Sequence, residues 1–190
     1  SLGVTSAMDL DGASVCVQPG TTTELNLADF FRANGMEFEP VVIESQAEVT
    51  AAYFAGRCDV FTTDASGLAA TRANDAPNPA DHVILPELVS KEPLGPVVRR
   101  GDDEFFAISK WVLFALLEAE EKGVTAANAD SMKADSTDPT VQRLLGASGD
   151  MGEKIGLDAS WALRAIKAVG NYGEIYDRNV GPATPIGLER

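Results

Sequence analysis

The sequence predicts an α/β fold in which a parallel-rich sheet is flanked by helices, followed by a helical C-terminal region. Two observations predict this arrangement. In the first half of the chain, short apolar runs rich in β-branched residues alternate with segments of helical periodicity, which is typical of consecutive βαβ units. In the second half, helical segments follow one another and are separated by polar stretches.

The elements of the first half follow from the local sequence. Residues 13–18 are apolar and β-branched and predict a buried strand, which Pro19-Gly20 ends. The apolar residues between Leu25 and Phe31 predict a helix that ends at Asn34-Gly35. The other elements expected in this half are a strand at 38–44, a helix ending at Gly56, a strand at 58–63, a helix at 64–74, a strand-like run at 82–85 and an extended piece at 94–99.

The second half predicts helices with little regular structure between them. Phe105, Phe106 and Trp111 lie at helical spacing with other apolar residues, which favours packing in a core, and Trp161 is interpreted in the same way. The expected elements are a long helix at about 103–122, a polar stretch at 125–139, and short helical pieces at 139–146, 150–155 and 159–169.

Charge and composition exclude several functions. A formal net charge of −14 disfavours nucleic acid as a partner, because phosphate binding requires a positive field. No run approaches the roughly 20 apolar residues that a membrane-spanning helix needs. With one histidine, His82, and two cysteines, the chain offers neither a tetrahedral zinc set nor a placed catalytic triad. We therefore expect no metal, no cofactor and no enzymatic activity.

The segment Gly20-Thr-Thr-Thr-Glu24 stands where the first strand gives way to a helix, and two interpretations are open. Thr21 and Glu24 have the spacing of a capping box, which is a purely structural device. The same helix N-terminus also suits an anion, because free N–H groups and the helix dipole favour negative charge there. In that case Gly20 allows close backbone approach, and the hydroxyls of Thr22 and Thr23 add donors.

Asp64 raises the same question at the end of the third expected strand. It precedes an expected helix and is a good N-cap, but it could instead accept hydrogen bonds from a ligand ammonium group. In parallel sheets, ligands bind at the carboxyl ends of the strands, and both motifs lie at that edge. Together they offer one pole for a carboxylate and one for an ammonium group, as a zwitterionic amino acid requires.

Cys16 and Cys58 lie on strands that are expected to be neighbours. In a reducing compartment they would be two small buried apolar residues. In an oxidising compartment they could form a disulfide if the register brings their α-carbons within about 7 Å. We favour the disulfide, and we expect Asp59 beside it to be structural.

Four segments together resemble the family 3 solute-binding proteins of bacterial ABC transporters, and most closely the general L-amino-acid-binding branch. The resemblance covers nearly the whole chain. The matching segments are Leu10-Asp-Gly12, Val15-Cys-Val-Gln-Pro-Gly-Thr-Thr-Thr-Glu24, Gly56-Arg-Cys-Asp-Val-Phe-Thr-Thr-Asp64 and Pro93-Leu-Gly-Pro-Val-Val-Arg-Arg-Gly-Asp102.

The resemblance implies a lobe of the periplasmic-binding-protein type II fold and a site for an L-amino acid. Thr22 and Thr23 would bind the ligand's α-carboxylate, and Asp64 would bind its ammonium group. Gln18 or Thr62 would line the pocket for the ligand's side chain, so that the expected ligand-binding residues are Gln18, Gly20, Thr21, Thr22, Thr23, Thr62 and Asp64. The implied role is capture in the periplasm and delivery to the membrane permease of an ABC transporter.

The chain departs from the family in lacking most of the first lobe, including the arginine that binds the ligand carboxylate there. Residues 5–94 are therefore expected to be the second lobe. Residues 95–190 are expected to be a hinge return strand and a C-terminal helical region that normally packs on the first lobe. Such a fragment should bind amino acids weakly, and it could self-associate to cover apolar faces around Phe105, Phe106, Trp111 and Leu116.

Two other functions stay open on the same fold. Related lobes occur in amino-acid-metabolising enzymes of the dehydratase kind, although the sequence shows no placed general base or cofactor lysine. A ligand-sensing domain of a receptor is the other alternative. It would need a signalling or membrane segment, which these 190 residues do not show but which a longer protein could carry.

Overall fold

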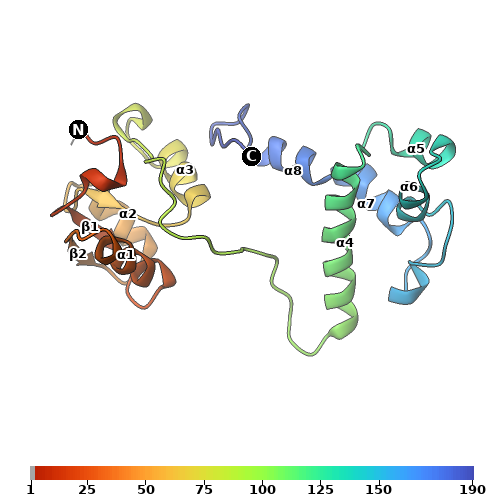
Figure 1. The fold of residues 1–190 in the computed structure, drawn as a ribbon, viewed down its shortest axis with the longest axis horizontal. Helices are drawn as coiled ribbons and strands as arrows, with labels where there is room; N and C mark the ends of the chain where they lie inside the picture. The colour runs from red at the N-terminus through yellow and green to blue at the C-terminus, as the bar shows by residue number, and fades with distance from the viewer. Residues whose placement is uncertain (1–2) are drawn as a thin grey trace. The chain divides into compact units, whose positions relative to one another are not determined.

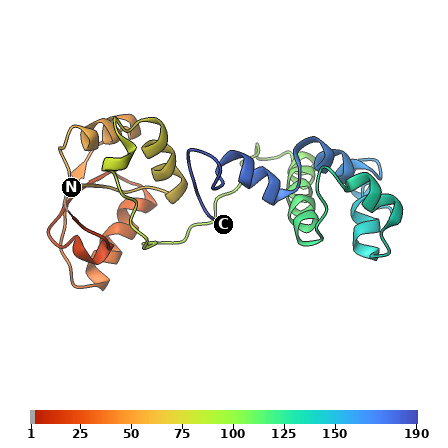
Figure 2. The same cartoon turned by 90° about the horizontal axis from the view of Figure 1, so that it is seen from above.

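A computed structural model describes residues 3–190, which divide into two compact units. The first unit runs to Pro93 and includes Pro185–Arg190, and the second comprises Leu94–Thr184. Figures 1 and 2 trace the elements of both units, which are described here one at a time. Among the described helices, none combines the length and the apolar character that crossing a bilayer would require.

The first unit contains a three-stranded parallel sheet, as the sequence predicted. Its strands are β1 (Ser14–Val17), β2 (Glu39–Val42) and β3 (Val60–Phe61), and the spatial order is β2-β1-β3. β1 pairs with β2 from Ser14↔Glu39 to Val17↔Val42, and with β3 at Val15↔Val60 and Cys16↔Phe61. β2 is an edge strand, and this position tolerates Pro40, which has no N–H to donate.

Helices cover both faces of this sheet because the side chains of β1 alternate between the faces. Val15 and Val17 are buried in one cluster with Leu27 and Phe31 of α1 (Thr22–Ala33). Cys16 lies in a second cluster with residues of α2 (Gln46–Phe54), while α3 (Ala65–Asn74) adds Leu68 to that cluster. The α/β class with a parallel sheet flanked by helices is therefore confirmed.

Two contacts tie β1 to the segment that leads into β3. Cys16 and Cys58 form a disulfide with an α-carbon separation of 5.6 Å, although Cys58 lies just before β3 and not in it. Next to the disulfide, the carboxylate of Asp59 accepts hydrogen bonds from the backbone N–H of Ser14 at 3.0 Å and from its hydroxyl at 2.6 Å. These bonds lower the pKa of Asp59. Asp59 is thus structural, as expected.

The predicted strand at 82–85 is wrong, and no strand forms at 94–99 among the described residues. Two short 3₁₀ helices, Ala7–Asp9 and Pro79–Asp81, are the regular elements outside the sheet and its three helices in this unit's described part. The physical reason is that an apolar extended run becomes a strand only when a neighbouring strand accepts its backbone hydrogen bonds. The hinge return strand expected after residue 95 has no such neighbour here.

The second unit is helical and contains no strand within its described residues. Its elements are α4 (Asp103–Glu121), α5 (Ala129–Asp135), α6 (Pro139–Leu144), the 3₁₀ helix Glu153–Ile155, α7 (Trp161–Val169) and α8 (Tyr172–Asn179). α5 lies in a stretch that was expected to be merely polar, and α8 was not predicted. The core joins buried residues of α4, α6 and α7, including Leu116, Val141 and Ile166. Trp161 packs with Ala115 and Ala162, as predicted.

The core prediction for the aromatic residues at the start of α4 is wrong. Phe105, Phe106 and Trp111 are 52%, 51% and 41% exposed, whereas Leu116, expected on an open face, is only 8% exposed. Lys110 lies near the faces of both the Phe106 and Trp111 rings, at 5.5 and 5.8 Å from the ring centres. Helical spacing correctly identified the apolar residues, but it could not tell which side of α4 the other helices of this unit would cover.

Candidate ligand-binding site

The candidate site lies at the C-terminal edge of the sheet in the first unit. β1 ends at Val17 and β3 at Phe61, and the helices that follow these strands begin at Thr22 and Ala65. Continuing the observed register places Thr62 opposite Val17. Because adjacent strands are separated by about 4.8 Å, the turn before α1 and the turn before α3 emerge side by side.

The first turn of α1 contains hydrogen bonds typical of a helix N-cap, which is the structural one of the two interpretations. Thr21 is the N-cap, and its hydroxyl oxygen accepts a hydrogen bond from the backbone N–H of Glu24 at 3.2 Å. The hydroxyl in turn donates to the carbonyl of Gln18 at 2.8 Å. The carboxylate of Glu24 accepts from the N–H of Gly20 at 2.8 Å, and Gly20 has a φ of 69°, which favours glycine. Thr21 therefore caps this helix, whereas the Glu24 carboxylate binds the N–H before the N-cap and does not complete the predicted capping box.

Thr22 and Thr23 follow the cap and are not used by it. Their backbone N–H groups lie in the first turn, where a helix offers no acceptor of its own. The Thr22 hydroxyl is exposed and donates to a carboxylate oxygen of Glu92 at 2.8 Å. The Thr23 side chain is half-buried and has no hydrogen-bond partner among residues 3–190. This turn thus offers an anion two backbone donors and the Thr23 hydroxyl, while the Thr22 hydroxyl is engaged by Glu92.

Asp64 occupies the N-cap position of α3, but it does not behave as a cap. Its carboxylate makes no capping hydrogen bond, unlike the side chains of Thr21, Ser45 and Asp102 at the starts of α1, α2 and α4. It is exposed and has no ion-pair partner within the described chain. The capping interpretation therefore does not account for Asp64, whose two oxygens are available to a cation or an N–H donor.

Gln18 and Thr62 lie at the same edge, but only one of their side chains is hydrogen-bonded within the described part of the fold. The side-chain amide of Gln18 donates to the carbonyl of Glu44 at 2.7 Å, so it fastens the end of β1 to the chain that follows β2. Thr62 is half-buried directly after β3. Gln18 is thus engaged in the fold, whereas Thr62 is placed at the rim with its hydroxyl uncommitted among residues 3–190.

Glu92 and Asn26 also lie at this edge, and neither is predicted from the sequence. The side-chain amide of Asn26 donates to the second carboxylate oxygen of Glu92 at 2.6 Å. Asn26 stands one helical turn after Thr22, so the two donors lie on the same face of α1. Glu92 is 66 residues further along the chain, in a segment without regular structure. No local pattern could have revealed this contact.

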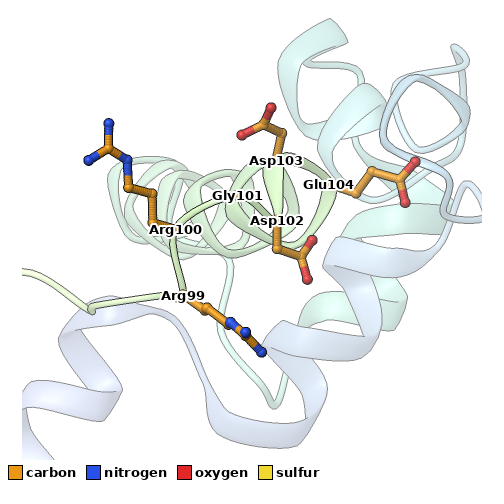
Figure 3. Close-up of a pocket in the computed structure, with 6 residues that line it drawn as sticks. All are labelled: Arg99, Arg100, Gly101, Asp102, Asp103 and Glu104. Atoms are coloured by element: carbon orange, nitrogen blue, oxygen red, sulfur yellow. The ribbon is translucent and has the colours of Figure 1, made fainter.

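A hollow of about 570 Å³ lies in the second unit at the start of α4, lined by residues 99–104. Figure 3 shows that its side chains do not converge, since Arg99 and Arg100 point apart and Asp102 and Asp103 point to different sides. The carboxylate of Asp102 also caps α4 by accepting from the N–H of Phe105 at 2.9 Å. Ligand sites bring a few polar groups together around a pocket, and this hollow does not.

The side chain of His82 packs against residues of α2 in the first unit. Its Nδ1 lies 2.9 Å from the hydroxyl of Tyr53, and its ring packs edge-on against Phe54. Burial raises the pKa of the Tyr53 hydroxyl. Within residues 3–190 no group of three or more His, Cys, Asp or Glu side chains is arranged to hold a metal ion. The donors and acceptors described above for the candidate site suit polar recognition by hydrogen bonds and charge.

Comparison with known proteins gives close relatives over the whole chain. It is 58% identical over 190 residues to a glutamate/glutamine/aspartate/asparagine-binding protein of Rhodobacter capsulatus. It is 54% identical over 191 residues to a general L-amino acid-binding periplasmic protein of Rhizobium johnstonii. None of the protein-family models compared with the chain matches it.

A solved structure agrees with these relatives. An ABC transporter/periplasmic binding protein from Brucella ovis with glutathione bound superposes with a TM-score of 0.89 at 53% sequence identity. The match covers 99% of this chain and 59% of that one. The chain likewise spans 56% and 55% of the lengths of the two curated relatives. The chain thus corresponds to somewhat more than half of each protein that it resembles.

Proposed function

The chain is a homologue of the amino-acid-binding periplasmic proteins of ABC transporters, and on that premise we propose that it takes part in capturing L-amino acids in the periplasm for delivery to a membrane permease. The relatives are binding proteins, and the role proposed here is likewise binding without chemical change. In this proposal residues 5–94 are the second ligand-binding lobe, and residues 95–190 are elements that pack on a first lobe.

The observation that carries the proposal is the state of Asp64. A carboxylate at the N-terminus of a helix normally accepts a hydrogen bond from that helix, because the first N–H groups lack partners. Asp64 accepts none, although its backbone takes the N-cap position. A group held at the carboxyl end of a parallel strand and left unbonded by the fold is suited to bind a ligand.

The proposed contacts follow from the two poles of an amino acid. The ligand's ammonium group donates hydrogen bonds to Asp64, and its carboxylate accepts from the N–H groups and hydroxyls of Thr22 and Thr23. Hydrogen bonds to charged groups are each worth about 1.5–3 kcal/mol, so the two poles together can select a zwitterion over a simple acid or amine. Thr62 would lie beside the ligand's side chain, and Gln18 would keep the end of β1 in place.

The affinity expected of this chain alone is low. In the proposal the ligand is enclosed between two lobes, and the edge described here supplies one side of the pocket. An open site leaves the ligand hydrated on its other side, which weakens each electrostatic contact. We therefore expect dissociation constants in the millimolar range. Micromolar or tighter binding by this chain would contradict the half-site interpretation.

Calorimetric or NMR titration with a panel of L-amino acids tests the proposal. Asp64→Asn should weaken binding by about tenfold or more, the loss expected for a charge-assisted hydrogen bond. Asp75→Asn is the matched control, because Asp75 is an exposed aspartate at the opposite end of α3 and the change of charge is identical. Equal affinities of the two variants would refute the role of Asp64.

The same titration separates binding from catalysis. A binding protein returns its ligand unchanged, so the amino acid recovered after prolonged incubation should be chemically identical to the amino acid added. Formation of ammonia or a keto acid would favour the dehydratase-like alternative instead.

A further inference from the structure

The segment of residues 82–92, here called the strap, is fastened to the first unit at three points. His82 pairs with Tyr53 of α2 at 2.9 Å. The carboxylate of Glu87 accepts from the Ser6 hydroxyl at 2.5 Å and from the backbone N–H of Ala7 at 2.9 Å, and these bonds lower the pKa of Glu87. The third point is Glu92 at the start of α1. Between these points the strap has no helix or strand, so side chains hold it.

The third fastening differs from the other two because it lies at the candidate site. Glu92 uses both carboxylate oxygens, one toward the Thr22 hydroxyl at 2.8 Å and one toward the Asn26 amide at 2.6 Å. Thr22 is one of the residues that the proposed function assigns to the ligand's carboxylate. A carboxylate from the chain itself therefore accepts hydrogen bonds from a donor that the ligand needs.

We infer that Glu92 is an intramolecular competitor of the ligand's carboxylate at the first turn of α1, and that ligand binding releases this end of the strap. This inference rests on the proposed function, since it concerns the same site. The Thr22 hydroxyl has one proton to donate, so it cannot bind the Glu92 carboxylate and the ligand's carboxylate at the same time. The two negative charges would also repel each other if both were held at the first turn of α1. The ligand can bind fully only when Glu92 has moved away.

The contact is suited to competition because it is weak enough to be displaced. Glu92 and Thr22 are exposed, so water replaces each hydrogen bond when the contact opens. A protein whose competent state is only partly populated binds with an apparent affinity reduced by that fraction. Removing the competing carboxylate should therefore tighten binding, which is the opposite of what is expected for a residue that contacts the ligand.

The release also has a structural consequence. Glu92 stands two residues before Leu94, where the second unit begins. The other two fastenings, at His82 and Glu87, do not involve the candidate site and are retained. Displacing Glu92 therefore frees only the last residues of the strap. Ligand binding would in this way release the segment that joins the two units.

The test compares the 190-residue chain with Glu92→Gln and with Glu37→Gln in titrations with L-glutamine. Glu37 is an exposed glutamate just before β2, at the opposite end of the sheet, and it provides the same loss of charge away from the site. We expect Glu92→Gln to bind about three- to tenfold more tightly than the unaltered chain, the gain from losing an exposed charged competitor. Glu37→Gln should bind with unchanged affinity.

Three results would overturn the inference, and they are distinguishable. Equal affinity of Glu92→Gln and the unaltered chain would show that Glu92 does not compete, while leaving the proposed function intact. Weaker binding by Glu92→Gln would make Glu92 a ligand contact. Failure of all three proteins to bind L-glutamine, together with failure of the unaltered chain to bind any member of the L-amino-acid panel, would overturn the proposed function together with the inference. Thermal unfolding of each variant establishes that it is folded before the titrations are compared.

Discussion

Reduction of the Cys16–Cys58 disulfide should destabilise the sheet of the first unit. The bond links residues 42 positions apart, and both cysteines are buried. For a loop of this length the chain-entropy estimate is about 4 kcal/mol, and measured contributions are typically about 2–4 kcal/mol. Because the bond joins β1 to the segment before β3, the loss should fall on the pairing that forms the edge of the candidate site.

Native-state hydrogen exchange of the backbone amides of Cys16 and Val17 measures this loss directly. These amides lie in the central strand, where exchange requires the largest openings. A loss of about 2–4 kcal/mol corresponds to exchange roughly 30- to 1,000-fold faster in the presence of a phosphine reductant. The double variant Cys16→Ala/Cys58→Ala is the control, and its exchange should be insensitive to the reductant.

Unchanged exchange after complete reduction would refute this reasoning. Such a result would mean that the two clusters on either side of the sheet hold β1 without the covalent link. It would also remove an argument for an oxidising compartment, because a bond that contributes nothing to stability gives no reason for the chain to keep two buried cysteines paired.

Three further predictions concern the second unit. The bidentate contact of Arg164 lowers the pKa of Asp158 to about 2, so the stabilisation from this pair is present above the ordinary carboxylate range and is lost as the pH falls through about 2. NMR titration should show this value, and Arg164→Gln should raise it toward 3.8. Gly146→Ala should destabilise the unit by about 2 kcal/mol or more in chemical denaturation, because an added Cβ would lie 1.9 Å from the carbonyl oxygen of Ala159 and φ is 70°; an unchanged midpoint would contradict this. The exposed aromatic face of α4, which Phe114 shares with Phe105, Phe106 and Trp111, should drive concentration-dependent self-association in light scattering, and Phe114→Lys should reduce it. A monodisperse monomer at all concentrations would contradict this.

The sequence predicted the sheet well where local chemistry determines structure. The β-branched run that becomes β1, the turn at Pro19-Gly20 and the end of α1 at Asn34-Gly35 all depend on residues within a few positions of one another. The run at 82–85 failed for the opposite reason. Its composition favours a strand, but a strand also requires a partner, and whether one is present cannot be seen from the run itself.

In the candidate site, too, features set by neighbouring residues could be predicted from the sequence, whereas contacts made by the folded chain could not. The capping role of Thr21 follows from its spacing to Glu24, and the structure shows the expected bond from the Glu24 N–H to the Thr21 hydroxyl oxygen. The Glu24 carboxylate instead accepts from the N–H of Gly20, one residue before the N-cap, so the reciprocal bond of a capping box is not formed. That Asp64 makes no capping bond depends on the orientation of one side chain, which spacing does not specify. The contact of Glu92 with Thr22 joins residues 70 positions apart through an irregular segment. Only the folded chain reveals it.

We propose that the edge formed by the starts of α1 and α3 binds the two poles of an L-amino acid. Mapping amide chemical shifts during titration with L-glutamine tests it most directly, because weak binding in fast exchange still identifies the residues involved. The largest changes are expected at the amides of Thr22, Thr23 and Asp64, with saturation at a common ligand concentration. Changes confined to the hollow at residues 99–104, or no saturable change anywhere, would contradict it.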